Sequence, residues 1–149
     1  MPLDLTGFNN QQLFFGTFFA LQNKIQRMGD RFYKEMTLKQ FFVVLVLQLF
    51  GNYQPTLKEL SDVAGSSYQN IKQIILKLEK HNIVEIINDG SDKRKMRIKM
   101  TEKCKALLDQ YDEKAQEFLN VLFAGVAPNE LESALTTLRK MDKNLMDLS

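Results

Sequence analysis

The chain has 149 residues, of which 44% are hydrophobic and 26% charged, and this composition is typical of a soluble globular protein with one compact domain. The formal net charge of +2 does not by itself indicate a partner. One cysteine and one histidine, Cys104 and His81, exclude an internal disulfide and a zinc site of the usual kind. No signal-peptide pattern is present, and the longest apolar run, residues 41–50, is too short to span a membrane. We therefore expect a cytoplasmic protein without a membrane partner.

The charge is distributed unevenly along the chain. Residues 67–105 contain 10 Lys/Arg and 5 Asp/Glu, a net charge of +5, whereas the remainder contains 10 and 13 and carries −3. A basic middle segment predicts a face that binds a polyanion such as a nucleic acid. An ordinary solvated surface is an equally open interpretation of the charge alone.

The first predicted element is a helix over residues 10–34. Large apolar side chains recur there at spacings of three and four, at Phe14, Phe18, Leu21, Ile25, Met28 and Phe32. This stripe is either part of the core or a dimer interface, and the pattern leaves both open. Thr37 is a good N-cap for the next helix, residues 38–50, which is apolar on nearly all sides and is therefore expected at the centre of the fold.

Residues 56–80 predict a helix-turn-helix. Thr56 and Glu59 form the pattern of a capping box, and the short helix that follows is expected to bury Leu57, Leu60 and Val63. A turn containing Gly65 leads to a second helix, capped by Ser67. Its apolar face consists of Ile71, Ile74, Ile75 and Leu78.

The outer face of that second helix is polar and contains no acidic residue: Tyr68, Gln69, Asn70, Lys72, Gln73 and Lys77. Asn and Gln can pair with adenine edges, and Lys with guanine or phosphate, in a major groove that admits a helix. The alternative is a helix-turn-helix that packs only against protein, for which an apolar or acidic face would be expected.

A β-hairpin is predicted next. Asn82 is suited to the left-handed position after a helix, residues 83–87 are rich in β-branched side chains, and Asp89-Gly90 is a turn signal. In the return strand, residues 96–100, the alternation places Met96, Ile98 and Met100 inward and Arg97 and Lys99 outward. The hairpin concentrates Lys93, Arg94, Lys95, Arg97 and Lys99, which either contact DNA or keep an edge strand soluble.

Two amphipathic helices end the chain. The first runs from the N-cap Thr101 to about Gly125 with Leu108, Tyr111, Ala115, Phe118 and Leu122 on one side; the second starts at Pro128 and carries Leu131, Leu135, Leu138, Leu145 and Leu148. Their acidic outer faces favour packing against the core or a partner helix over a membrane surface. Cys104 lies at a helix start beside Lys103, and two interpretations are open: a thiol whose pKa is lowered by this position, or a thiol packed in the core.

The order of these elements, together with three short motifs, resembles the MarR family of bacterial transcription regulators over nearly the whole chain. The motifs are Leu78-Glu79-Lys80-His81-Asn82-Ile83-Val84, Asp92-Lys93-Arg94 and Met100-Thr101. Asn82 stands where the family usually has Gly, and Cys104 stands where it often has Gly.

The resemblance implies a mostly α (α+β) fold: a single domain over 1–149 with about six helices and a β-hairpin wing. Residues 37–101 would form the winged helix-turn-helix, and 8–34 and 102–148 the dimerisation part of a homodimer. The recognition helix would contact DNA through Ser67, Tyr68, Gln69, Asn70, Lys72, Gln73 and Lys77. The wing would contribute Asp92, Lys93, Arg94 and Lys95. Dimerisation would use Phe14, Phe18, Leu21, Phe118, Leu122, Leu135, Leu138 and Leu145.

The resulting hypothesis is a homodimeric regulator that binds double-stranded operator DNA in a sequence-specific way. It would act as a repressor and be released by a small, aromatic, anionic effector, for which Phe15, Phe19, Met28, Phe41 and Phe42 offer apolar surface. The alternative is a winged-helix protein–protein adaptor. No triad that His81 could complete, no phosphate-binding glycine loop and no metal spacing is present, so neither an enzyme nor a cofactor or metal is expected.

Overall fold

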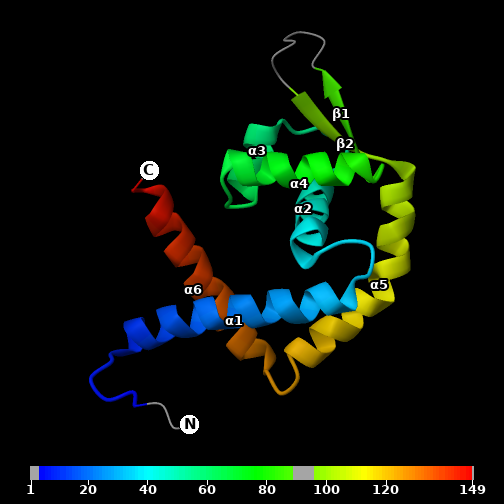
Figure 1. Cartoon of the computed structure of the whole chain (residues 1–149). Coiled ribbons are helices and arrows are strands. Elements are labelled where there is room, and N and C mark those ends of the chain that lie inside the picture. The colour runs from blue at the N-terminus through cyan, green and yellow to red at the C-terminus, as the bar shows by residue number, and fades with distance from the viewer. Residues whose placement is uncertain (1–3, 89–95, 149) are drawn as a thin grey trace. The chain divides into compact units, whose positions relative to one another are not determined.

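The computed structural model describes residues 4–88 and 96–148. Within these ranges the elements follow in the predicted order (Figure 1): α1 (Asn10–Phe32), α2 (Leu38–Leu49), α3 (Leu57–Val63), α4 (Tyr68–Lys80), β1 (Val84–Asn88), β2 (Met96–Met100), α5 (Glu102–Leu122) and α6 (Pro128–Met146). The predicted mostly helical fold with a two-stranded wing is thereby confirmed. The chain divides into two compact units, Met1–Asp112 and Glu113–Ser149, with the boundary inside α5.

Three helices, α2, α3 and α4, form the centre of the first unit and contact one another pairwise. The core between them consists of fully buried aliphatic side chains, among them Val43, Val44, Leu60, Ile71 and Ile75. Burying a side chain of this size contributes roughly 1.5–3 kcal/mol. The position of α2 at the centre is confirmed for one face only, because Phe42, Leu45 and Leu49 remain exposed, Leu49 to 77%.

The predicted helix starts at Thr37, Thr56 and Ser67 are confirmed. The Thr37 and Thr56 hydroxyls each accept a hydrogen bond from the backbone N–H three residues on, at 3.2 Å, and the side chains of Gln40 and Glu59 accept from the cap N–H in return. These capping boxes satisfy donors that a helix start otherwise leaves without partners.

The prediction that Val63 is buried is wrong. Val63 is 53% exposed, while Leu57 and Leu60 are buried as expected, together with Ser61. A helix face repeats at three and four residues, so the positions that follow Leu57 on its face are 60, 61 and 64. Val63 lies beside that face, and half-buried Ala64 takes the inner position in the last turn.

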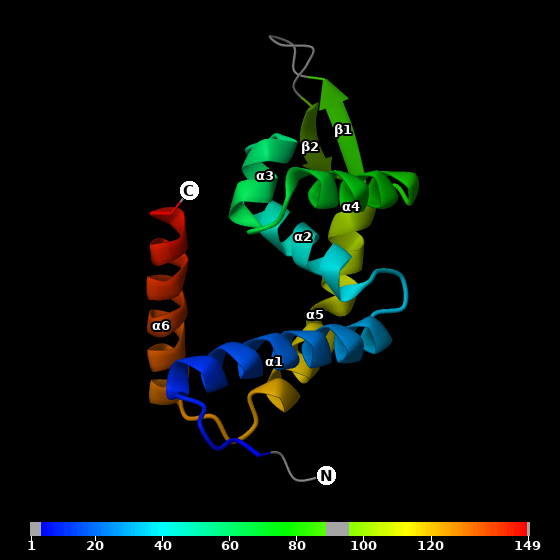
Figure 2. The ribbon, with the colours of Figure 1, turned by 60° about the vertical axis from the view of Figure 1, so that its left-hand side comes forward.

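The hairpin is antiparallel with the register Val84↔Met100 to Asn88↔Met96, and it extends beyond α4 (Figure 2). The predicted inward alternation of β2 is confirmed, since Ile98 is buried and Met96 and Met100 are half-buried. The predicted wing residues Asp92, Lys93, Arg94 and Lys95 lie outside the described residues.

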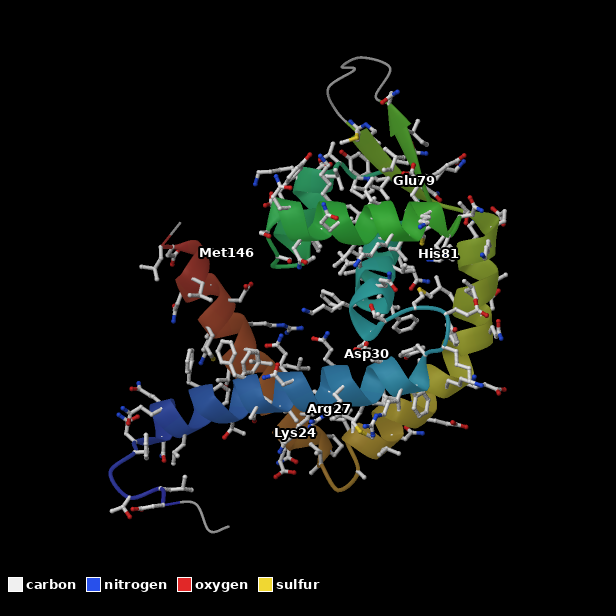
Figure 3. The ribbon with its side chains drawn as sticks, in the orientation of Figure 1. Lys24, Arg27, Asp30, Glu79, His81 and Met146 are labelled. Carbon is white, nitrogen blue, oxygen red and sulfur yellow. The ribbon has the colours of Figure 1, made fainter. Side chains whose placement is uncertain are left out.

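A close contact joins the end of α1 to the start of α2. Asp30, labelled in Figure 3, accepts a hydrogen bond from the backbone N–H of Leu38 at 2.7 Å. A Cβ atom at Gly29 would lie 2.7–2.9 Å from the side-chain carbons of Leu38, so the two helices approach here through a glycine. The buried ring of Tyr33, next to this contact, stacks on Phe41 at 4.4 Å between ring centroids.

In the second unit, α5 ends at Leu122, three residues before its predicted end near Gly125. Gly125 has a φ of +78°, which takes the chain out of the helical conformation before Pro128 starts α6 at its first position, as predicted. None of the residues of α6 is buried. Among the described residues, no helix is both long and apolar enough to cross a membrane.

Candidate nucleic-acid interface

The N-terminal end of α4 is held by two serines. Gly65, with a φ of +60°, makes the turn after α3, and the hydroxyl of Ser67 accepts a hydrogen bond from the Asn70 backbone N–H at 3.2 Å. The side-chain amide of Asn70 also donates to the hydroxyl of Ser66 at 2.8 Å. This second bond orients Asn70 and is not indicated by the usual N-cap pattern.

The C-terminal end of α4 is closed by a left-handed residue, as predicted for Asn82, whose φ is +57°. The N–H of Asn82 bonds to the Glu79 carbonyl at 2.8 Å, and that of Ile83 to the Leu78 carbonyl at 2.9 Å. This pair of bonds is a Schellman motif. Figure 3 shows Glu79 and His81 at this end of the helix.

The first turn of α5 holds the three carbonyls that follow α4. The Lys103 ammonium donates to the carbonyl of His81 at 2.9 Å. The Thr101 hydroxyl donates to the carbonyl of Asn82 at 2.7 Å, and the Thr101 N–H donates to that of Ile83 at 3.2 Å. The predicted N-cap role of Thr101 is confirmed, because its hydroxyl also accepts from the Cys104 N–H at 3.1 Å.

The two faces of α4 differ as the sequence predicts. Ile71, Ile75 and Leu78 are buried and Ile74 is half-buried. On the other side Lys72 is half-buried, and the remaining members of the predicted recognition set are exposed: Ser67, Tyr68, Gln69, Asn70, Gln73 and Lys77. The structure therefore leaves a polar face on α4 accessible, while contact of its side chains with DNA stays a prediction.

A third backbone segment, besides β1 and β2, takes part in the base of the wing. On the edge of β2 that β1 does not use, the N–H of Ile98 donates to the carbonyl of Pro55 at 2.9 Å, and Arg97 forms an isolated antiparallel bridge with Thr56. The segment between α2 and α3 is thus joined to β2 by an isolated bridge.

Arg97, which the alternation of β2 places on the outward side, is held there by other parts of the chain. Arg97 is half-buried, and its Nη1 donates to the carbonyl of Gln54 at 2.8 Å and to the hydroxyl of Tyr53 at 3.2 Å. Its guanidinium carbon lies 5.5 Å from the centroid of the Tyr53 ring, within the range of a cation–π contact. Lys99, the next outward position of β2, is exposed as predicted.

Tyr53 extends this contact to the start of α3. Its hydroxyl donates to one carboxylate oxygen of Glu59 at 2.8 Å, and the other oxygen accepts from the Thr56 N–H at 2.7 Å. The hydrogen bonds from the Thr56 backbone and from Tyr53 hold the pKa of Glu59 below its usual range, with a smaller contribution from the charge of Arg97. The capping box can be recognised in the sequence, but the contact between Tyr53 and Arg97 cannot, because the two residues are 44 positions apart and share no local pattern.

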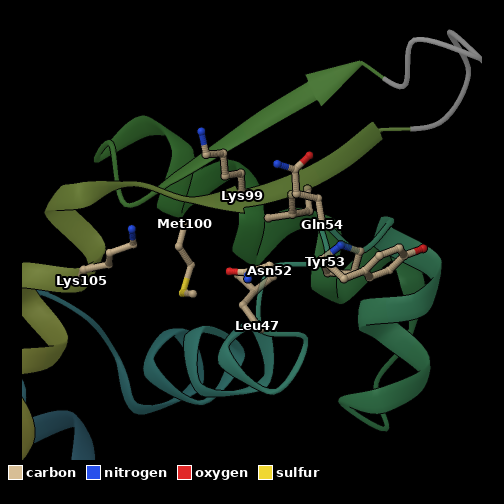
Figure 4. Close-up of a pocket in the computed structure, with 10 residues that line it drawn as sticks. Leu47, Asn52, Tyr53, Gln54, Lys99, Met100 and Lys105 are labelled. Atoms are coloured by element: carbon tan, nitrogen blue, oxygen red, sulfur yellow. The ribbon is translucent and has the colours of Figure 1, made fainter.

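A groove of about 140 Å³ lies beside this network. Figure 4 shows Leu47 and Met100 between Lys105 on one side and Tyr53 on the other. Polar and apolar groups line it in similar measure, among them Lys99 and Lys105, and Lys105 is already paired with Glu102 at 2.7 Å.

Cys104 is a packed thiol. It is fully buried, and burial raises its pKa to about 11. Of the two interpretations of its position, the lowered pKa at a helix start is therefore wrong. Its backbone N–H is taken by Thr101, and removal of the sulfur from water disfavours the thiolate. Among the described residues, no group of three His, Cys, Asp or Glu side chains is placed to hold a metal ion.

No protein-family model matches the chain. Solved structures do match. The RdhR-CbdbA1625 transcriptional regulator in its 2,4-dichlorophenol-bound form has a TM-score of 0.85 and 19% identity over 100% of this chain and 89% of that one. The MarR protein from Peptoclostridium difficile has a TM-score of 0.82 and 21% identity over 99% and 95%. For Bordetella bronchiseptica BpsR, whose DNA binding is regulated by 6-hydroxynicotinic acid, the values are 0.77 and 18% over 95% and 98%.

The chain has the fold of the MarR transcriptional regulators. At these identities the likeness concerns the MarR fold and not individual side chains, so each predicted site residue is judged by its own surroundings. These structures are of regulators and not of enzymes.

The residues predicted to form the dimer interface differ in their exposure to solvent. Phe118 and Leu122 are half-buried. The others are exposed: Phe14, Phe18, Leu21, Leu135, Leu138 and Leu145. Of the apolar residues suggested for an effector, Phe41 is buried under Tyr33, whereas Phe15, Phe19, Met28 and Phe42 are exposed.

Proposed function

We propose that the chain belongs to the MarR family and acts in the cytoplasm as a homodimeric, sequence-specific DNA-binding transcriptional regulator. The observation that carries the proposal is the exposed face of α4, where Gln69, Asn70, Gln73 and Lys77 stand together without an acidic residue inside a winged helix-turn-helix. Amides and an ammonium are the groups that read base edges and contact phosphates in a major groove.

The wing supplies the second part of the proposed interface. Arg94 is assigned to the minor groove, whose negative potential attracts an inserted arginine, and Lys93 and Lys95 to the flanking phosphates. Asp92 is assigned to holding the wing's conformation. The net charge of residues 67–105, which is +5 with these wing residues included, favours the approach of a polyanion to this segment.

Homodimerisation is supported by apolar surface that the single chain does not bury. Phe14, Phe18 and Leu21 of α1 and Leu135 and Leu145 of α6 are each more than two-fifths exposed, Leu145 to 65%. Monomeric proteins rarely expose so many large apolar side chains along helices. Sedimentation equilibrium should give twice the chain mass of 17.3 kDa, and Leu145→Glu with Leu135→Glu should shift it toward the monomer.

Regulation by a small aromatic effector is proposed from what similar structures bind, namely 2,4-dichlorophenol and 6-hydroxynicotinic acid. A repressor of this kind would occupy its operator without effector and leave it when the effector binds. Adding these two compounds to a preformed complex is the first screen, with loss of the DNA signal as the expected result for a fitting ligand.

The experiment that tests the function is fluorescence anisotropy with the duplex upstream of the protein's own gene, against a shuffled duplex, across a salt series. Preferential binding to the native duplex, with log affinity falling steeply with log salt, is the expected result. Equal, weak and salt-insensitive binding to both would reject DNA regulation through this duplex and favour the adaptor hypothesis.

Single substitutions assign the contacts. Gln69→Ala should reduce discrimination between the two duplexes by roughly 1–3 kcal/mol if the side chain makes a bidentate base contact. Arg94→Ala should weaken binding without dissociating the dimer. Lys58→Ala is the matched control, because Lys58 is an exposed cation of α3 paired with Asp62 and is outside the proposed interface.

A further inference from the structure

The base of the wing contains a chain of hydrogen bonds that the proposed DNA contacts do not require. Arg97 directs one guanidinium nitrogen at two acceptors of the protein itself, the Gln54 carbonyl and the Tyr53 hydroxyl, at 2.8 and 3.2 Å. A guanidinium held in this way is oriented toward the connector between α2 and α3.

We propose that Arg97 is a positioning residue of the wing: it fixes β2 to the connector before α3 and thereby sets how the basic segment that precedes it meets DNA, without contacting DNA itself. This inference rests on the proposed function for its consequence in binding. Its structural part, the attachment of β2, stands on the contacts of described residues alone.

The attachment is made at adjacent points of β2. The N–H of Ile98 bonds to the Pro55 carbonyl at 2.9 Å, and the neighbouring Arg97 side chain bonds to the two residues before Pro55. A two-stranded hairpin is marginally stable alone, so its direction depends on what holds its base. The backbone bond of Ile98 and the side-chain bonds of Arg97 therefore hold β2 to the connector together.

Tyr53 links this attachment to the helix-turn-helix. Its hydroxyl accepts from Arg97 and donates to Glu59, whose carboxylate in turn closes the capping box with Thr56. A continuous series of bonds therefore runs from β2 to the first turn of α3. Tyr53 is 51% exposed, and polar contacts at the surface contribute little to the free energy of unfolding.

The test compares Arg97→Gln, Arg97→Lys, Tyr53→Phe and the Arg97→Gln/Tyr53→Phe double variant by affinity for the native duplex. Each single substitution removes part of the same hydrogen-bond chain, so each should weaken binding roughly 3- to 10-fold, the range expected for one hydrogen bond. The double variant should bind within about twofold of Arg97→Gln, because the two changes break one shared contact. The thermal midpoint should remain close to that of the unmodified protein.

Two variants separate positioning from direct phosphate contact. Arg97→Lys keeps the charge but loses the planar fork, so a phosphate role predicts near-normal binding and a positioning role predicts a loss. Lys99→Gln is the matched control, since it removes one charge from the next outward position of the same strand. If Lys99 contacts a phosphate, this change lowers the salt slope by about 1 without coupling to Tyr53→Phe.

Additive losses in the double variant, normal binding of Arg97→Lys or normal binding of Tyr53→Phe would each overturn the inference. Failure of the unmodified protein to bind DNA would instead reject the proposed function. Hydrogen exchange of the Ile98 amide in the free protein then decides the structural part. Both Arg97→Gln and Tyr53→Phe should accelerate it at least severalfold, and unchanged exchange would overturn the attachment.

Discussion

The hydroxyl of Thr101 acts both as an acceptor and as a donor, and replacing it by a group of the same shape isolates the value of these contacts. It accepts from the Cys104 N–H at 3.1 Å as the cap of α5, and its one hydrogen is shared between the carbonyls of Asn82 at 2.7 Å and Ile83 at 3.0 Å. Loss of a threonine cap typically costs about 1 kcal/mol, and loss of a further hydrogen bond about another 1 kcal/mol. Thr101→Val should therefore lower the free energy of unfolding by about 2 kcal/mol.

The assay is urea unfolding followed by far-UV circular dichroism at one fixed protein concentration, because association with a second chain would make the midpoint concentration-dependent. Thr37→Val is the matched comparison. Its hydroxyl caps α2 at 3.2 Å, so its loss should cost about 1 kcal/mol. Thr101→Ser retains the hydroxyl and should lose less than about 1 kcal/mol, the contribution of one partly buried methyl group.

Equal losses in Thr101→Val and Thr37→Val would show that donation by the Thr101 hydroxyl to the carbonyls of Asn82 and Ile83 adds nothing to stability. A Thr101→Val protein as stable as the unmodified one would refute the reasoning altogether, including the view that α5 is joined to the end of α4 through this side chain.

Three further predictions concern single positions. Asn82→Ala should lower the free energy of unfolding by about 1 kcal/mol because alanine is strained at a φ of +57°, whereas Asn82→Gly should not, as thermal midpoints would show. The Cys104 thiol, with its pKa raised to about 11, should resist a thiol reagent at neutral pH until urea unfolds the protein; as pH rises from the ordinary thiol range toward 11, stability should fall, a loss that Cys104→Ala should lack. Glu59, whose pKa is lowered, should stabilise the fold above its ordinary pKa and lose this contribution as pH falls through the folded-state value; urea midpoints in acidic buffers should vary less with pH in Glu59→Gln.

The features that the sequence predicts well are those written in neighbouring residues. The caps at Thr37, Thr56 and Ser67 each depend on bonds that span three positions, and the turn at Asn82 depends on one backbone conformation. The alternation around Ile98 likewise follows from the two-residue period of a strand. Such patterns need no knowledge of distant parts of the chain.

The features that it predicts poorly depend on contacts between distant residues or on which side of an element is covered. The alternation of β2 places Arg97 outward but does not reveal its hydrogen-bond partners, which lie 43 and 44 residues away in the sequence. An apolar pattern indicates that Leu49 is suited to burial, but it does not say whether the same chain covers it. The pKa of Cys104 was decided by burial, which a neighbouring lysine in the sequence does not reveal.

The three successive carbonyls held by the first turn of α5 have a mechanical consequence. Bonds from Lys103 and Thr101 to residues 81–83 join the end of α4 to the start of α5. The Schellman motif fixes the last turn of α4, so the direction of α4 is coupled to that of the start of α5. A tilt of the start of α5 would therefore be passed to α4, and α4 would carry α2 and α3 with it because the three helices pack against one another pairwise. Gln69 and Asn70, in the first turn of α4, would then change direction together with the whole helix-turn-helix.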